Sequence, residues 1–134
     1  NMGDYFNHWI EMGKKIKNPP KIFNVNWFRT DDNGNFIWPG FGDNLRVLDW
    51  IIDRCEDKVE ANETAMGYVP NAEDINIEGL EGEVSVDSLK KILDVDKALW
   101  KEETNGIEEF YAKFGKTLPA ELAKELDTLK ANLD

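Results

Sequence analysis

The run Asn18-Pro19-Pro20 constrains this chain more than any other feature, because the spacing of apolar residues changes across it. From about residue 4 to residue 17, apolar or small residues recur at steps of three and four, which is typical of an amphipathic helix. They are Tyr5, Phe6, Trp9, Ile10, Gly13 and Ile16. Because a residue that precedes proline avoids the α-helical region of backbone space, the sequence predicts a helix that ends before Pro19.

Beyond the prolines, the hydrophobic period falls to two. The stretch KIFNVNWF, residues 21–28, alternates between an apolar face and a mixed face, which predicts a strand. The apolar face consists of Phe23, Val25 and Trp27. Asn33-Gly34 is a strong hairpin-turn signal, and residues 35–38 return as a second short strand that Pro39-Gly40 ends. A small β-hairpin is therefore expected near the N-terminus.

The remainder of the chain is predicted to be mainly helical. Asp43 is placed to cap a helix whose apolar positions are Val47, Leu48, Ile51, Ile52 and Cys55. Residues from about 57 to 84 read as an acidic loop with a short strand near 67–69. Three further helices are expected: one capped by Ser85, one from Leu99 to Phe114 that Gly115 closes, and one that starts at Pro119. The predicted fold class is α+β, mostly helical, with a small N-terminal β-hairpin or sheet.

The charge of the chain restricts its partners. It carries 27 acidic and 16 basic residues, a formal net charge of -11, so nucleic acid and acidic membrane surfaces are not expected partners. No apolar run approaches the roughly 18 residues that a membrane-spanning helix needs. Cys55 is the only cysteine, which rules out an internal disulfide and favours a cytoplasmic location. Its place in an apolar stripe predicts a buried, inert thiol.

Several chemical motifs fail on spacing. His8 is the only histidine and has no cysteine or second histidine at metal-ligand spacing, so no metal site is predicted. Asp31-Asp32-Asn33-Gly34 lacks the ligand spacing of a calcium loop and is interpreted as a turn. Gly40-Phe41-Gly42 precedes a helix but matches neither a Walker loop nor a dinucleotide fingerprint. Asp43 also places a negative charge where a phosphate would dock.

Aromatic residues are concentrated near the N-terminus, where four of the five tryptophans and five of the seven phenylalanines fall within the first 50 residues. Phe28 ends the first predicted strand, Phe36 begins the second, and Phe41 lies on a loop between two glycines, shortly before Asn44. Two facing rings beside an amide form a slot for a planar heteroaromatic ring, and stacking on a base contributes roughly 1–3 kcal/mol. On composition alone, the interpretation of these rings as ordinary core residues is favoured over a base-binding slot.

The segments NPPKIF, VNWFR, FIWPGFG and RVLDW together resemble the C-terminal part of GTP-dependent phosphoenolpyruvate carboxykinase. The resemblance implies a lyase of gluconeogenesis that converts oxaloacetate and GTP to phosphoenolpyruvate, GDP and carbon dioxide, with manganese in the active site. It also implies that Phe28 and Phe41 clamp the guanine, that Phe36 flanks it and that Asn44 reads its edge. Asn24 and Leu45 depart from residues common in the family, and Leu45 puts the hydrogen-bonding role of its neighbour Asn44 in doubt.

The same resemblance implies that the chain is one C-terminal segment, residues 1–134, of a larger α/β nucleotide-binding lobe. Within it, residues 1–17 are expected to form a helix, 18–44 a base-binding hairpin and loop, and 45–134 a helical tail. The family's phosphate loop, metal ligands and substrate-binding arginines find no counterpart here, so no catalytic residue and no metal ligand is assigned. The expected partners are the nucleotide and the remainder of the carboxykinase chain. The segment alone is expected to be inactive and to self-associate.

A second hypothesis belongs to a different class of protein. An independent α+β domain could use the same aromatic patch to bind a protein partner, because exposed aromatic surface suits a partner as well as a base. An open reading frame that continues upstream through a phosphate loop and metal ligands would favour the enzyme. A start codon near Met2 would favour the independent domain.

Overall fold

The computed structural model describes all 134 residues, and they divide into two compact units. Residues Asn1–Pro20 and Val95–Asp134 form one, which we call the helical unit. Residues Lys21–Asp94 form the other, the aromatic unit. Most of the regular structure is helix, with one two-stranded antiparallel sheet, so the predicted α+β class is confirmed.

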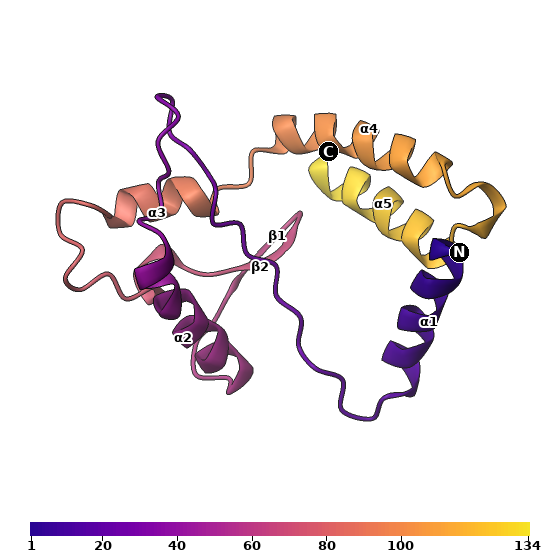
Figure 1. Ribbon diagram of the computed structural model, residues 1–134, viewed down its shortest axis with the longest axis horizontal. Helices are drawn as coiled ribbons and strands as arrows, with labels where there is room; N and C mark the ends of the chain where they lie inside the picture. Colours follow the sequence, from indigo (N-terminus) through magenta and orange to yellow (C-terminus); the bar gives the residue numbers. More distant parts are fainter. The chain divides into compact units, whose positions relative to one another are not determined.

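Three α-helices make up the helical unit (Figure 1): α1 at Met2–Lys15, α4 at Lys97–Ala112 and α5 at Ala120–Leu133. Helix α1 starts two residues earlier than predicted because the side chain of Asn1 accepts a hydrogen bond from the backbone N–H of Gly3. The carboxylate of Asp96 caps α4 in the same way. The last helix, predicted to start at Pro119, begins one residue later at Ala120, with Pro119 at the N-cap position.

Helices α4 and α5 run antiparallel beside each other (Figure 1). Lys97 donates to the carbonyl of Asn132 at 3.2 Å, and Lys130 pairs with Glu108 at 2.8 Å. A short 3-10 turn, η3 at Gly115–Thr117, joins the two helices, and Phe114 at its start packs against Phe6 of α1 with ring centroids 5.7 Å apart. Polar contacts between α4 and α5, together with the contact of Phe6 with Phe114, therefore link the three helices of this unit.

The aromatic unit has little regular structure relative to its length. It contains α2 at Asn44–Cys55, the strands β1 at Asn62–Thr64 and β2 at Gly67–Val69, and α3 at Val86–Leu93, with 3-10 turns η1 at Phe41–Asp43 and η2 at Ala72–Asp74. The strand predicted near 67–69 is confirmed as β2, whose Gly67 and Val69 lie opposite Thr64 and Asn62. Ser85 caps α3, as predicted, through a reciprocal pair with Ser88.

Tryptophan forms much of the core of the aromatic unit. Trp38 and Trp50 are each 6% exposed and lie in one cluster with Leu89 of α3. Phe23 meets Trp50 edge to face at 6.4 Å, and Trp27 lies 6.3 Å from Trp38. The cluster is completed by Ala72, Ile75, Leu80 and Val84. Aromatic side chains other than those of the predicted base slot therefore make up much of this core.

The predicted N-terminal hairpin forms only at its tip. Residues 21–28 alternate in burial as expected, with Phe23, Val25 and Trp27 partly buried, but they pair with no other strand. The single bridge joins Thr30 to Phe36. Alternation reports which side chains meet the core, whereas a strand also needs a neighbouring backbone to complete its hydrogen bonds. In the aromatic unit, such a neighbouring backbone is present only beside the turn.

Helix α2 buries a different face from the one predicted. Val47, Trp50 and Ile51 pack on the core, whereas Leu48 and Ile52 are about half exposed. The thiol of Cys55 is exposed, so its predicted burial is wrong. The reason is that Trp50, the largest apolar side chain of the helix, rotates the buried face away from Cys55. Asp43 precedes the helix, but its side chain makes no capping hydrogen bond.

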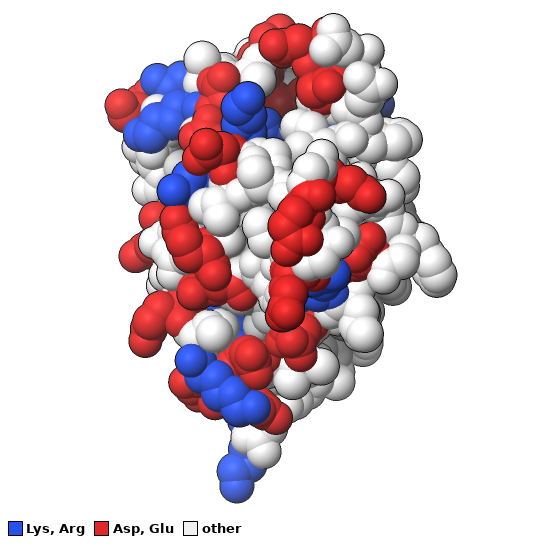
Figure 2. All heavy atoms as spheres, turned by 90° about the vertical axis from the view of Figure 1, so that its left-hand side faces the viewer, with Lys and Arg blue, Asp and Glu red and all other residues white.

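Acidic side chains dominate much of the surface. On the face shown in Figure 2, carboxylates are widely spread and basic groups occur in small clusters between them. This distribution agrees with the formal net charge of -11 and makes that face unfavourable for a polyanion. Among the helices, none combines the length and the apolar character required to cross a bilayer.

Candidate functional site

Three phenylalanines of the aromatic unit are exposed, in contrast to its buried tryptophans. Phe28 is 70% exposed, Phe36 is 64% exposed and Phe41 is 94% exposed. All three belong to the 18–44 segment in which the sequence places its candidate site. Apolar rings of this size lose favourable burial when they face water, so their exposure together is the feature of this surface that needs an explanation.

Phe28 and Phe36 are brought together by the hairpin tip. Ile37 donates its backbone N–H to the carbonyl of Arg29 at 3.0 Å, which aligns the two segments beside the bridge. The ring centroids of Phe28 and Phe36 are 6.0 Å apart and the rings meet edge on at 63°. The face of one ring and the edge of the other therefore remain turned toward solvent as a small apolar surface.

Asp31 organises the turn between these two rings. Its carboxylate accepts hydrogen bonds from the backbone N–H groups of Asn33 and Asn35, each at 2.9 Å, and from the side chain of Asn35. The backbone hydrogen bond from Asn35 is the main reason that the pKa of Asp31 lies below its ordinary value. Gly34 takes a φ of 82°, which fits the predicted turn at Asn33-Gly34. The carboxylate serves the turn as a local hydrogen-bond acceptor.

The backbone that carries Phe28 is anchored by the next residue. The guanidinium of Arg29 donates to the carbonyl of Ile92 at 2.8 Å and to that of Asp94 at 3.2 Å. These carbonyls belong to the end of α3, where backbone acceptors lack helical partners and a cation is favourable. Arg29 thus ties the hairpin to a helix more than 60 residues further along the chain. Nothing in the local sequence pattern signals this contact.

Phe41 is displayed by a glycine turn. Gly40 has a φ of 114° and a ψ of -156°, a conformation that residues with a Cβ rarely adopt. Gly42 does not need a positive φ, and a Cβ on either glycine would meet nothing within 4 Å. The ring of Phe41 pairs with no other aromatic ring, whereas Phe28 and Phe36 meet edge on. The first glycine is therefore the one that the geometry of this turn requires.

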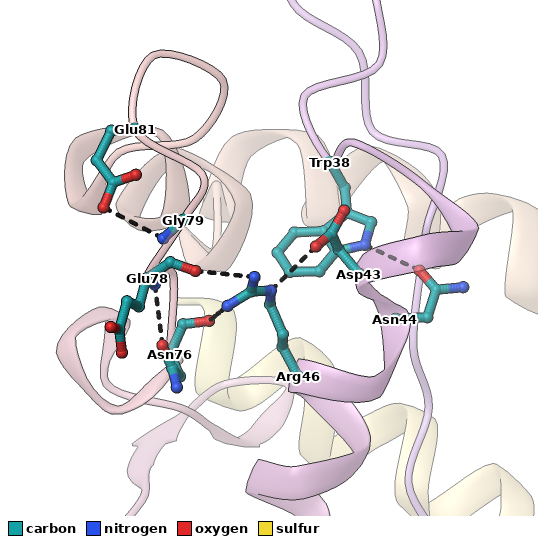
Figure 3. A network of polar contacts seen from close by, with 8 residues as sticks. All are labelled: Trp38, Asp43, Asn44, Arg46, Asn76, Glu78, Gly79 and Glu81. Atoms are coloured by element: carbon teal, nitrogen blue, oxygen red, sulfur yellow. Dashed lines mark hydrogen bonds and ion pairs between the residues drawn. The ribbon is translucent and has the colours of Figure 1, made fainter.

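Asn44 is the first residue of α2, and its amide is already engaged on one side. The indole Nε1–H of Trp38 donates to Asn44 Oδ1 at 2.9 Å. Trp38 belongs to the buried cluster, so the amide is connected directly to the core of the unit. The amide nitrogen of Asn44 makes no hydrogen bond within the protein and points away from Trp38 in Figure 3. It is a free donor next to the exposed Phe41 turn.

Arg46 holds the start of α2 in place (Figure 3). Its Nε donates to Asp43 at 3.0 Å, and its two terminal nitrogens donate to the carbonyls of Asn76 at 3.0 Å and Glu78 at 2.9 Å. Asp43 therefore orients an arginine instead of capping the helix. A guanidinium suits this role because its planar array of donors reaches three acceptors at once. Arg46 was not predicted from the sequence, although its spacing of three from Asp43 was a usable signal.

No cluster of three or more histidine, cysteine, aspartate or glutamate side chains comes together in a way that could hold a metal ion. His8 belongs to the helical unit and is exposed. The manganese implied by the resemblance therefore does not fit the residues of this chain. The candidate site contains aromatic rings, an amide and two structural arginines.

The fold and this surface define a mostly helical α+β domain that displays aromatic side chains beside a turn and a helix start. A family model described as the phosphoenolpyruvate carboxykinase C-terminal P-loop domain matches residues 1–132. The chain therefore belongs to the GTP-dependent phosphoenolpyruvate carboxykinase family.

Relatives from distant organisms agree with this assignment. A protein of Treponema pallidum (strain Nichols) named "Phosphoenolpyruvate carboxykinase [GTP]" is 50% identical over 137 residues, covering 100% of this chain. Proteins with the same name are 50% identical in Paenarthrobacter aurescens, over 98% of the chain, and 46% identical in Thermoplasma volcanium, over 99%. In each case the chain spans 22% of the relative's length, so it corresponds to a C-terminal portion of a larger enzyme.

Proposed function

We propose that this chain forms the guanine-binding wall of the nucleotide site in a GTP-dependent phosphoenolpyruvate carboxykinase. The reaction is the conversion of oxaloacetate and GTP to phosphoenolpyruvate, GDP and carbon dioxide, a step of gluconeogenesis. The observation that carries the proposal is the exposure of Phe28, Phe36 and Phe41 in a unit that buries its tryptophans. A planar base that stacked on those rings would shield them from water, which is favourable for apolar side chains.

Each residue of the site has a proposed role. Phe28 and Phe41 stack on the two faces of the guanine, and Phe36, which touches Phe28, flanks it. Each stacking contact contributes roughly 1–3 kcal/mol and depends little on which base is bound. Asn44 distinguishes the base, because an amide donor or acceptor can pair only with a complementary group on the base edge.

The phosphates and the metal are proposed to bind to other parts of the protein. The chain has no Walker pattern, and the carboxylate of Asp43 lies at the start of α2, where an anion would otherwise dock. Relatives extend far beyond the matched region, which leaves room for a phosphate loop and for manganese ligands. We further propose a cytoplasmic location, in keeping with the single cysteine.

The alternative of an independent interaction domain receives less support. Every relative named above covers nearly the whole chain and carries the carboxykinase name. The exposed aromatic patch is compatible with either hypothesis, so it does not favour the alternative. The lyase is therefore the function that the observations support best.

The test uses the full-length enzyme with Phe41→Ala, Asn44→Ala and Phe110→Ala as a matched control. Phe110 is also a partly exposed phenylalanine but belongs to the helical unit. Phe41→Ala should weaken both GTP and ATP binding by roughly 1–3 kcal/mol through lost stacking. Asn44→Ala should reduce the preference for GTP over ATP more than it reduces overall affinity. The control should leave both affinities unchanged.

Isothermal titration with GTP, GDP and ATP measures these effects directly. Unaltered GTP affinity in Phe41→Ala would show that this ring is not part of the base site. Equal losses of GTP affinity in Phe41→Ala and Phe110→Ala would point to a general effect on the fold, and would count against the proposal equally.

A further inference from the structure

The hydrogen bond between Trp38 and Asn44 determines which way the amide faces. An indole N–H can only donate, so the atom that it meets at 2.9 Å must be the carbonyl oxygen of the amide. The amide nitrogen is then on the opposite side, where it has no partner within the protein. Rotating the amide by half a turn would place two donors against each other and would lose the hydrogen bond.

Both ends of this hydrogen bond are held rigidly. Trp38 is 6% exposed and packs against Trp27, so its indole has little freedom to move. Asn44 starts a helix whose first turn is fixed by the three hydrogen bonds of Arg46. The amide is therefore presented to the site in a single orientation, as a donor.

A fixed donor distinguishes guanine from adenine. Guanine carries an acceptor, O6, at the position where adenine carries an amino group. An asparagine that rotates freely can match either base, because its oxygen pairs with the adenine amino group as well as its nitrogen pairs with O6. With its oxygen occupied by Trp38, Asn44 offers only its N–H groups, which adenine would meet with another donor.

We propose that Trp38 is a positioning residue for base selectivity: it holds Asn44 with its amide nitrogen toward O6 of the guanine. This inference rests on the proposed base site and adds a residue that does not itself touch the nucleotide. The role requires the indole N–H, whereas the packing of the aromatic unit requires only the ring.

Trp50 provides a matched control within the same core. It is also 6% exposed and belongs to the same cluster as Trp38, but its Nε1 has no hydrogen-bond partner. Trp38→Phe and Trp50→Phe both remove an indole from the core, and only the first removes a hydrogen bond to the site. Any difference between them in base selectivity therefore reports on that bond.

The measurement is kcat/KM of the full-length enzyme with GTP and with ATP. In Trp38→Phe, the ratio of the two values should fall about five- to tenfold, in keeping with the loss of one hydrogen bond. In Trp50→Phe the ratio should be unchanged, even where both variants lose the same amount of thermal stability. An unchanged ratio in Trp38→Phe overturns the proposal.

A second substitution covers the case in which Trp38→Phe does not fold. Replacing Trp38 with 3-benzothienylalanine keeps the shape of the ring but puts sulfur in place of the N–H. The same fall in the GTP to ATP ratio is expected, and an unchanged ratio again overturns the proposal. Asn44→Ala separates this result from failure of the base site itself. If Asn44→Ala keeps the preference for GTP over ATP, the proposed function fails at this residue. If Asn44→Ala loses that preference and the Trp38 variants keep it, only the positioning role of Trp38 is refuted.

Discussion

Single side chains, more than strand ladders, hold the backbone that displays the exposed phenylalanines. Arg29 fixes the segment that ends at Phe28, Asp31 closes the turn before Phe36, and Arg46 secures the helix that follows Phe41. Each of these side chains satisfies backbone groups that have no regular partner, which an irregular segment near the surface requires. The shape of the site therefore depends on a few side-chain contacts, each of which a single substitution would remove.

The titration of Asp31 tests whether the hairpin tip depends on a single side chain. Because the pKa of Asp31 is lowered in the folded chain, its carboxylate stabilises the folded turn at pH values above the ordinary aspartate pKa. This stabilisation is lost as the pH falls through the lowered pKa. We expect faster hydrogen exchange at the backbone amides of Asn35 and Ile37 as the pH falls through that range, after correction for the intrinsic rate. Asp31→Ala should produce the same increase at neutral pH.

Asp32→Ala serves as the control for Asp31, since it removes a neighbouring carboxylate that accepts no hydrogen bond in the turn. The exchange rates of Asn35 and Ile37, measured by NMR, should not change in that variant. Equal protection in Asp31→Ala and the unmodified chain would mean that the hairpin tip does not need the carboxylate.

Helix α1 packs so closely against η3 that there is no room for a side chain at one position of the helix. Gly3 is buried, and a Cβ added there would overlap the carbonyl oxygen of Thr117 and lie 2.9 Å from its Cβ. A backbone carbonyl moves only if the turn that carries it moves. The approach of the first helix to the rest of its unit thus depends on the absence of one side chain.

Gly3→Ala should therefore destabilise the helical unit, by roughly 1–3 kcal/mol as is usual for overpacking. Gly13→Ala in the same helix is the control, because a Cβ there would meet nothing within 4 Å. That control should be neutral or stabilising by up to about 1 kcal/mol, through the better helix propensity of alanine. Urea unfolding followed by circular dichroism measures both. Similar changes in the two variants would show that the contact with Thr117 does not limit the packing.

Apolar surface left open by both units suggests that further protein covers this chain in the complete enzyme. Helix α2 exposes Leu45, Leu48 and Ile52 at helical spacing along one face, and α1 exposes Tyr5 and Trp9. The backbone of residues 21–28 is extended but has no partner strand. Such features are typical of surfaces that pack against another part of a protein, and the relatives are several times longer than the matched region.

The isolated segment should consequently self-associate as its concentration rises, because association buries part of this surface. Trp9→Glu should reduce the association by placing a charge on the exposed face of α1. Asn7→Glu adds the same charge at an exposed polar position of that helix and should have a smaller effect. Sedimentation velocity across a range of concentrations measures the outcome. A strictly monomeric segment at high concentration would contradict this expectation.

Local patterns predicted much of the fold correctly. The helix cap at Ser85, the turn at Asn33-Gly34 and the end of the first helix before Pro19 depend on residues a few positions apart. The alternation of residues 21–28 also predicted the inward side chains. The role of Phe28, Phe36, Phe41 and Asn44 was inferred from resemblance, since spacing alone left the core interpretation open, and it remains a proposal.

Features that depend on distant segments could not be read from such patterns. Whether residues 21–28 form a ladder depends on a neighbouring backbone, and the exposure of Cys55 depends on which face of α2 meets the core. Arg29 finds its acceptors more than 60 residues away, and Trp38 reaches Asn44 across a turn. Residue periods and caps are properties of a short stretch of chain, whereas hydrogen-bond partners and buried faces are set by the way separate stretches pack against one another.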